Sequence, residues 1–174
     1  MVNISYLYFS EYDPGEVHGI QIIETCNALA DLGHEVTLYS RGDIEPFIEK
    51  HGLSVEFPIE SCPGKAFTMT VNRGIYYTYS LAKARNSDII YTRDIRFLKY
   101  LSLLPAVNHP PIVYEAHKVY SQLEGMSEEQ ERSYIANAET VIAISKGVER
   151  DLERIGIDVN DVVSVGVDYS KIPS

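Results

Sequence analysis

The sequence has no tryptophan, only two cysteines, and no apolar run that approaches the length of a membrane span. A membrane-spanning helix needs about 18 or more predominantly apolar residues, and the first ten residues, MVNISYLYFS, also lack the basic start and long apolar core of a secretory signal. Cys26 and Cys62 lie 36 residues apart without the spacing of a zinc site, so we expect free thiols in a reducing compartment. These features predict a cytoplasmic location, either free in the cytoplasm or at the inner face of the membrane.

Basic residues are scarce, because 15 Lys and Arg stand against 25 Asp and Glu and give a net charge of -10. This balance argues against binding to long nucleic acids, whose phosphates need a basic surface. The charge is nevertheless uneven, since residues 61–114 hold seven bases and two acids, a local excess of +5. These bases either lie on solvent-exposed helix faces or form a wall that attracts an anion. The anion could be a phosphorylated substrate or an acidic membrane surface in peripheral contact.

Several motifs of common enzyme classes are missing. The sequence has no G-x-G-x-x-G, no P-loop, no G-x-S-x-G and no H-E-x-x-H. These absences argue against a nicotinamide cofactor, a nucleotide triphosphatase, a hydrolase triad and a metalloprotease-type zinc site. We therefore expect no cofactor and no metal.

Apolar runs alternate with stretches of helical periodicity along all 174 residues, 45% of which are hydrophobic. Helix-length crossovers between strands require parallel pairing, so we predict a single α/β domain with a doubly wound, mostly parallel, Rossmann-like sheet of about seven strands and helices on both faces. Strands are expected at Ile4–Phe9, Glu35–Ser40, Leu53–Phe57, Asp88–Tyr91, Ile112–Glu115, Thr140–Ile144 and Val162–Val165. Helices are expected at Ile20–Leu32, Ile44–His51, Phe67–Arg85, Ile95–Leu104, Ser127–Asn137 and Lys146–Ile155.

Ligands of such sheets bind beyond the carboxyl ends of the strands, which directs attention to the loops that follow them. The first of these, EYDPGEVHG, covers residues 11–19 and holds Gly15 and Gly19. We expect both glycines to permit positive φ and close ligand approach, with an anion favoured at the start of the following helix. A tight turn without a ligand is the alternative.

Motifs in a fixed order along the chain resemble the N-terminal domain of retaining GT-B glycosyltransferases of family GT4. They are the P-G-x-x-x-G turn, LADLGHEVTL at 29–38, DIIYTR at 88–93, EAH at 115–117, AISKG at 143–147 and GVD at 166–168. The resemblance implies transfer of a sugar from a nucleotide-sugar donor to an acceptor hydroxyl without a bound metal. A non-catalytic sugar- or phospholigand-binding module of the same fold is the alternative, because fold alone does not decide function.

The resemblance also implies a domain boundary. Residues 1–165 correspond to the acceptor-side domain and residues 166–174 to the start of the interdomain linker. The nucleotide-sugar domain is then expected on the C-terminal side in a longer protein or on a second chain. Without it the fragment is expected to be inactive, since the groups that stabilise the leaving diphosphate belong to that half.

The resemblance assigns a catalytic role to His117, beside the reacting sugar. Arg93 suits a phosphate through its planar fork, with an ion pair to Asp94 or another acid as the alternative, and Ser145 either binds ligand or caps a helix. Lys118 stands where the family often has an aspartate and suits an anionic or lipid-phosphate-linked acceptor. The expected substrate-binding residues are Gly15, Glu16, His18, Gly19, Arg93, Lys118 and Ser145.

Overall fold

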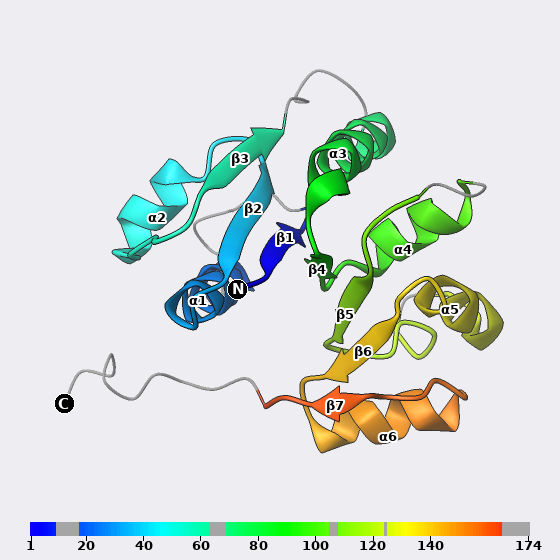
Figure 1. The fold of residues 1–174 in the computed structure, drawn as a ribbon. Helices are drawn as coiled ribbons and strands as arrows, with labels where there is room; N and C mark the ends of the chain where they lie inside the picture. The colour runs from blue at the N-terminus through cyan, green and yellow to red at the C-terminus, as the bar shows by residue number, and fades with distance from the viewer. Residues whose placement is uncertain (10–17, 63–68, 105–107, 124, 165–174) are drawn as a thin grey trace.

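Strands and helices alternate along the chain in the computed structural model, which describes residues 1–9, 18–62, 69–104, 108–123 and 125–164 (Figure 1). Every neighbouring strand pair is parallel, and the strand order is β3-β2-β1-β4-β5-β6-β7. The strands are β1 (Asn3–Leu7), β2 (Glu35–Arg41), β3 (Ile59–Cys62), β4 (Ile89–Thr92), β5 (Ile112–Ala116), β6 (Thr140–Ala143) and β7 (Asp161–Val162). The predicted doubly wound parallel sheet of seven strands is confirmed.

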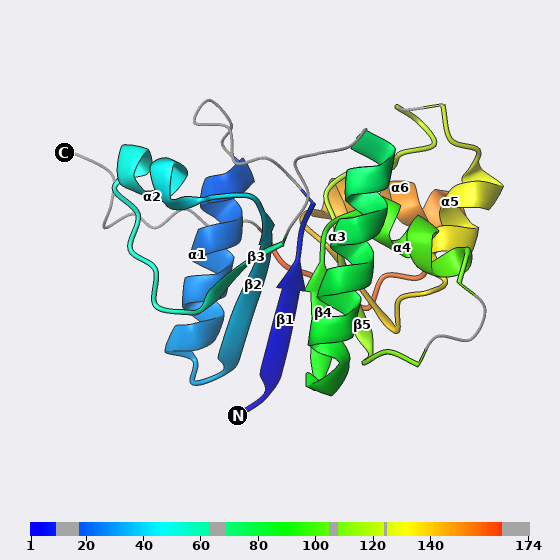
Figure 2. The same cartoon turned by 90° about the horizontal axis from the view of Figure 1, so that it is seen from above.

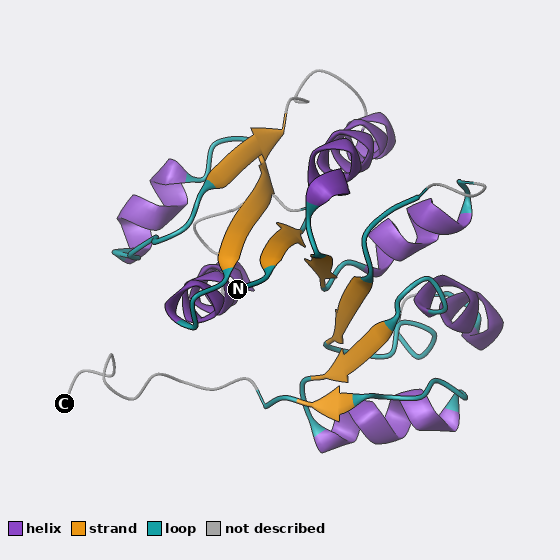
Figure 3. Cartoon of the chain, viewed as in Figure 1, coloured by secondary structure: helices purple, strands orange, loops and turns teal. Residues whose placement is uncertain are grey.

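Helices cover both faces of the sheet (Figures 2 and 3). They are α1 (His18–Asp31), α2 (Glu45–His51), α3 (Met69–Lys83), α4 (Ile95–Ser102), α5 (Glu128–Ile135) and α6 (Lys146–Arg154), with a short 3-10 helix, η1 (Ala84–Asn86), after α3. In both views α1 and α2 lie on one side of the strands, and α3, α4 and α5 lie on the other. This is the arrangement that right-handed crossovers produce when the chain winds outward in two directions from a central strand.

Two apolar cores stabilise these layers, one on each face of the sheet. The first joins α1 and α2 to β1 and β2 and includes Ile22, Cys26 and Phe47, all fully buried. The second lies under α3 to α6 and includes Phe97 and Leu152. Both cysteines are free thiols, as the sequence predicts, and both are buried.

The third strand differs from its predicted position. Residues 53–57 do not form a strand, and β3 begins at Ile59, directly after Pro58. The side chain of Asn27 on α1 occupies this connection, because its amide donates to the Ser54 carbonyl at 2.8 Å and accepts from the Glu56 amide at 3.2 Å. Proline has no N–H for the ladder, whereas the Pro58 carbonyl accepts from Leu38 at 3.0 Å, so pairing starts there.

The first helix also departs from the prediction, because α1 begins at His18 rather than Ile20. Gly19 is therefore a buried helical residue, and it is not among the glycines with positive φ. The predicted positive φ of Gly19 is wrong. At the other end of α1, Gly33 does have a positive φ of 85°, which confirms the predicted helix stop. The capping box that starts α5, Ser127 with Gln130, is formed as expected from the sequence.

A buried carboxylate at the start of α4 leads to a stability prediction. Asp94 caps α4 by accepting from the Arg96 amide, and its other oxygen accepts from the Tyr77 hydroxyl at 2.6 Å. Burial raises the pKa of Asp94, while these two hydrogen bonds favour the ionised form. Tyr77→Phe should therefore destabilise the protein by about 2 kcal/mol, seen as a fall of about 4–8 °C in the thermal unfolding midpoint.

Tyr6 supplies the matched control for that substitution. Its side chain is fully buried, stacks on Tyr91 with ring centroids 5.1 Å apart, and its hydroxyl has no hydrogen-bond partner among the described residues. Tyr6→Phe keeps the ring and removes only that hydroxyl, so we expect the unfolding midpoint to stay the same or rise. Equal losses for the two variants would contradict the assigned role of the hydrogen bond from Tyr77 to Asp94.

Candidate active site

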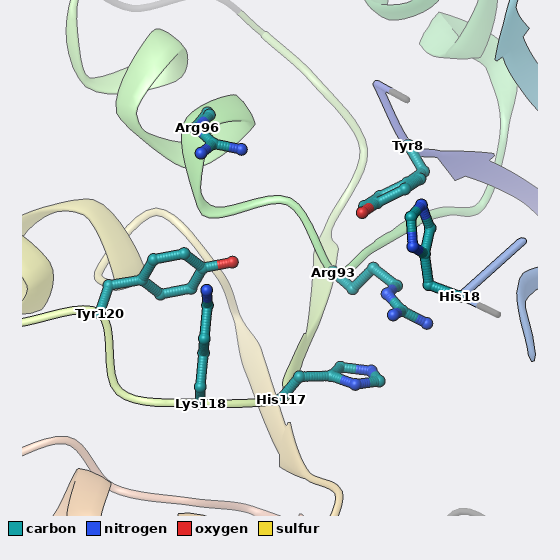
Figure 4. Close-up of a pocket in the computed structure, with 7 residues that line it drawn as sticks. All are labelled: Tyr8, His18, Arg93, Arg96, His117, Lys118 and Tyr120. Atoms are coloured by element: carbon teal, nitrogen blue, oxygen red, sulfur yellow. The ribbon is translucent and has the colours of Figure 1, made fainter. Parts of the chain in front are cut away.

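The pocket lies at the carboxyl edge of the sheet, where β1 pairs with β4 and the winding direction changes. Its volume is about 220 Å³, and Figure 4 shows the side chains that surround it. They come from the residue after β1, the first residue of α1, the β4–α4 connection, the first turn of α4 and the loop after β5. The lining residues are Tyr8, His18, Arg93, Arg96, His117, Lys118 and Tyr120.

Four of the predicted site residues meet in this pocket, namely His18, Arg93, His117 and Lys118. The other four predicted residues, Gly15, Glu16, Gly19 and Ser145, have a different outcome or none. Gly19 is buried inside α1 and does not line the pocket. Gly15 and Glu16 lie outside the described residues. The predicted ligand contacts of Gly15 and Glu16 stay predictions, and so do those of the four pocket residues.

Ser145 has the helix-capping role that is the simplest interpretation of its sequence position. It is the N-cap of α6, and its hydroxyl accepts from the Val148 amide at 3.2 Å. This bond satisfies one of the amides that the first turn of a helix leaves without a partner. Ser145 is not among the pocket residues, so its position gives no support to the predicted substrate contact.

His117, the residue after β5, is held by a carboxylate from that strand. Its Nε2 hydrogen-bonds to Glu115, whose second oxygen accepts from the hydroxyl of Tyr91. Burial raises the pKa of Glu115, but the hydrogen bonds from His117 and Tyr91 outweigh it, and the net shift is downward. An ionised carboxylate has no proton to give, so Nε2 of His117 carries the proton in this bond. Nδ1 is then the ring nitrogen that remains for a ligand.

Arg93 is positioned by neighbours on β1 and α1. Its guanidinium donates to the Gln21 side chain at 3.4 Å and lies over the Tyr8 ring, 5.4 Å from the ring centroid. Tyr8 in turn packs edge to face on His18, with ring centroids 5.7 Å apart. The carboxylate of Asp94 instead caps α4, so the structure does not support an ion pair between Arg93 and Asp94. The other acid that the alternative allowed is Glu115, because the charge of Arg93 contributes to lowering the pKa of Glu115.

A buried acid anchors the loop that carries Lys118. Glu131 on α5 is fully buried, and its two oxygens accept from the backbone amides of Tyr120 and Ser121 at 2.8 and 2.7 Å. Lys118 lies over the Tyr120 ring with its Nζ 4.6 Å from the ring centroid, the geometry of a cation–π contact. The loop therefore presents a cation and an aromatic ring to the pocket from a fixed backbone.

Sequence reasoning missed several residues that build this site. Arg96 counted only toward the local charge, and Glu115 appeared only as a letter of the EAH motif. The charge excess and the strand-end motif were the available signals for these two. Nothing in the sequence pairs Glu131 with a loop ten residues before it, or brings Tyr8 beside His18.

Two further classes of feature are not found in the described part of the chain. Across residues 1–9, 18–62, 69–104, 108–123 and 125–164, no group of three or more His, Cys, Asp or Glu side chains is arranged to hold a metal ion. In the same ranges no helix combines the length and the apolar character that crossing a membrane requires.

Several solved structures share this fold. HepE from Anabaena, in complex with UDP and glucose, superposes with a TM-score of 0.67 at 19% identity, and the match covers 97% of this chain and 45% of HepE. Sucrose-phosphate synthase from Thermosynechococcus elongatus gives a TM-score of 0.62 at 13% identity over 94% of this chain and 48% of the synthase. The lipopolysaccharide outer core galactosyltransferase WaaB gives 0.60 at 14% identity, covering 92% of this chain and 44% of WaaB.

These similarities establish the fold, since identities this low carry no more than that. The chain spans less than half the length of each of these three proteins, and its sheet is one Rossmann-like half of a GT-B fold. No curated protein sequence matches the chain significantly. The family model described as Glycosyltransferase Family 4 matches residues 19–171, which is most of the chain. The chain therefore belongs to glycosyltransferase family 4.

Proposed function

We propose that this chain is the acceptor-side, N-terminal domain of a retaining glycosyltransferase. The complete enzyme transfers a hexosyl group from a nucleotide sugar to an acceptor hydroxyl. The observation that carries the proposal is the pocket itself, in which His117, held by Glu115, lies with Arg93 at the switch point of a family 4 domain. In the reaction the bond from the anomeric carbon to the diphosphate oxygen breaks, a bond to the acceptor oxygen forms, and the proton of the acceptor hydroxyl passes to an oxygen of the departing diphosphate.

The pocket residues divide into two tasks under this proposal. His117 contacts the transferred sugar through Nδ1, because Nε2 is engaged by Glu115. Arg93 and His18 position the ligand from the β1 side, and Lys118 does so from the β5 loop. The residues that stabilise the departing diphosphate belong to a second Rossmann-like domain, which this proposal assigns to the C-terminal side of a longer protein or to a second chain. Residues 166–174, its proposed linker, lie outside the described part of the structure.

The proposal has a supporting comparison and a cellular setting. HepE binds UDP and glucose, or UDP-glucose, in its solved structures, so UDP-sugars are the first donors to test. Two buried free cysteines fit a reducing compartment, and we propose a cytoplasmic location, with peripheral contact at the inner membrane face if the acceptor is a lipid.

A donor screen tests the proposal. The protein that contains both halves of the fold, called here the two-domain protein, is incubated with each of a set of nucleotide sugars, and release of nucleoside diphosphate is measured with and without candidate acceptors. We expect release with one donor and a product with retained anomeric configuration, and no release by the 174-residue chain alone. Saturable donor or acceptor binding by the two-domain protein without any turnover would instead indicate a binding module.

Removal of metal gives a separate prediction. Cationic side chains and helix N-termini are proposed to stabilise the leaving phosphates in place of a bound ion. Treatment of the active two-domain protein with EDTA, followed by gel filtration, should therefore leave kcat unchanged within about twofold, since loss of a catalytic ion costs several kcal/mol. Loss of activity that Mg²⁺ or Mn²⁺ restores would contradict this prediction.

A further inference from the structure

A hydrogen-bonded chain of side chains runs from the middle of the sheet to His117. Tyr91 lies on β4, and its hydroxyl donates to Glu115 on the neighbouring strand β5 (Figure 1), whose other oxygen is bonded to Nε2 of His117. Tyr91 pairs with Val113 in the register of the two strands. Glu115 comes two residues later on β5, so its side chain is on the same face as that of Val113. The strand register therefore brings Tyr91 to the carboxylate that holds His117.

The ring of Tyr91 is fixed by packing. It stacks on Tyr6, its register partner on β1, with the ring centroids 5.1 Å apart and an angle of 23° between the ring planes. Tyr6 belongs to the apolar core under α1, together with Ile22 and Cys26, and Tyr91 packs against this core. A ring held in this way loses little further conformational entropy when its hydroxyl donates a hydrogen bond. The hydroxyl of Tyr91 is thus presented to Glu115 from a preorganised position.

Glu115 is a largely buried carboxylate that depends on its hydrogen-bond donors. Its side chain is 13% exposed. Burial raises the pKa of Glu115, whereas the hydrogen bonds from His117 and Tyr91 and the charge of Arg93 lower it, and the net shift is downward. Each of the two hydrogen bonds uses a different oxygen of the carboxylate. Together they fix its orientation as well as its charge.

Three further ionisable groups near Glu115 stay neutral. Burial is the main cause that raises the pKa values of Tyr6, Cys26 and Tyr91, and the charge of Glu115 raises all three further. Tyr91 therefore keeps its proton and donates, since an ionised carboxylate can only accept. Loss of this donor would remove the bond on one side of the carboxylate and allow it to turn away from Nε2 of His117.

We propose that Tyr91 is a positioning residue of the sugar-transfer reaction, which holds Glu115 in the orientation that fixes the proton on Nε2 of His117. The inference rests on the proposed function for the reaction, whereas the chain of hydrogen bonds is a property of the domain itself. Tyr91 is not among the described residues that line the pocket, and it acts through Glu115. Removal of its hydroxyl should therefore change how His117 is held more than how the ligand is enclosed.

Titration of the Glu115 carboxyl group, followed by carbon NMR, tests the chain of hydrogen bonds in the 174-residue protein without any substrate. Tyr91→Phe keeps the ring and removes only the donor hydroxyl. We expect Glu115 to become about a threefold to tenfold weaker acid, the change that loss of one hydrogen bond produces. An unchanged acidity of Glu115 in this variant would overturn the proposal.

Tyr6→Phe is the matched control, because it removes a hydroxyl from the other ring of the same stacked pair. The hydroxyl of Tyr6 is buried and has no hydrogen-bond partner among the described residues. Tyr6→Phe should therefore leave the acidity of Glu115 unchanged. Equal changes in the two variants would show that the packing of the rings, and not the hydrogen bond from Tyr91, controls Glu115, and they would overturn the proposal.

Kinetics of the two-domain protein test the role of Tyr91 in sugar transfer. We expect Tyr91→Phe to lower kcat about threefold to tenfold, with the KM values of donor and acceptor changed less than about twofold, and Tyr6→Phe to keep the full rate. Rates are measured well below the unfolding midpoint of each variant, so that a loss of folded protein does not contribute. A raised KM with an unchanged kcat would overturn the positioning role.

The variant Glu115→Gln shows whether Tyr91 acts through this carboxylate. Glutamine has one acceptor oxygen, and while Tyr91 donates to it the NH₂ group faces His117. Without the hydroxyl of Tyr91 the amide can turn and offer its oxygen to Nε2. Tyr91→Phe should therefore lower kcat no further in the Glu115→Gln background, which makes the double-mutant cycle strongly non-additive. The same loss in both backgrounds would overturn the proposal.

The two kinds of measurement separate this inference from the proposed function. A weaker acid at Glu115 in Tyr91→Phe, in a two-domain protein that turns over no nucleotide sugar, would support the link between Tyr91 and His117 and refute the proposed function. Active transfer, with kcat and the acidity of Glu115 both unchanged in Tyr91→Phe, would refute the role of Tyr91 and leave the proposed function intact.

Discussion

Replacement of His117 by alanine is expected to lower the kcat of sugar transfer by the two-domain protein about 100-fold or more. The ring contacts the reacting sugar under our proposal, and loss of one preorganised hydrogen-bonding group at a site of developing charge costs about 10²–10³ in rate. The side chain is 21% exposed and packs at the end of β5, so truncation should affect catalysis more than folding. Initial rates at saturating donor and acceptor measure the effect.

Two further variants make this result specific. His109→Ala removes an imidazole that precedes β5, at the opposite edge of the sheet, where its Nδ1 hydrogen-bonds to the Pro110 carbonyl. It should keep the activity of the unmodified protein. His117→Gln retains a polar side chain of similar reach and should recover part of the lost rate. Full activity in His117→Ala, with an unchanged unfolding midpoint, would remove His117 from the mechanism.

Glu115→Gln is expected to reduce kcat about 10–100-fold without blocking substrate binding. A carboxylate that accepts from Nε2 fixes both the ring orientation and the position of the proton, whereas the amide can offer its NH₂ group and permit the other arrangement. Hydrogen bonds to charged groups contribute about 1.5–3 kcal/mol, which corresponds to this range of rates. Glu115 acts through His117, so it is a positioning residue, and KM for the donor should change much less than kcat.

The pH dependence of stability provides a readout that a purely geometric role for Glu115 would not produce. The pKa of Glu115 is lowered in the folded protein, so the folded state holds its proton less tightly than the unfolded state, where a glutamate titrates near about 4.3. The stabilisation is fully present above that value and is lost as the pH falls through the folded-state pKa. Glu115→Gln should therefore lower the free energy of unfolding by about 1–3 kcal/mol at pH 7 and by progressively less as the pH falls below about 4.3.

An exposed acid on another element provides the control. Glu128 is on the first turn of α5, with its side chain 62% exposed and only a 4.0 Å contact to Arg132. Glu128→Gln should change the free energy of unfolding by less than about 1 kcal/mol, as is typical of surface pairs. A loss in Glu115→Gln that does not diminish as the pH is lowered would show that the charge of Glu115 is not the source of this stabilisation.

The parts of the fold that depend on local pattern were predictable. Buried runs such as Ile4–Leu7 and caps such as Ser127 with Gln130 are encoded within a few residues of one another, and helix-length spacing determines parallel pairing. The strand predicted at Leu53–Phe57 failed because Asn27, from another helix, satisfies the backbone of that segment. Apolar composition alone contains no information about such a partner.

The site was predictable to the extent that it follows from topology. Residues after β4 and β5 meet because the carboxyl ends of neighbouring parallel strands share one edge, which brings Arg93 and His117 together. The side-chain partners were not predictable, because Gln21 beside Arg93 and Glu131 under the β5 loop are contacts between separate elements. Gly19 illustrates the opposite error, since its turn-like sequence context does not reveal that α1 already includes it.

The most direct test of the central claim is a crystal structure of the two-domain protein with a non-hydrolysable nucleotide sugar. We predict that the sugar ring lies at the pocket lined by Tyr8, Arg93 and His117, with one of its hydroxyls within hydrogen-bonding distance, about 2.6–3.2 Å, of Nδ1 of His117. A sugar bound elsewhere, with that pocket facing away from the donor, would contradict the account.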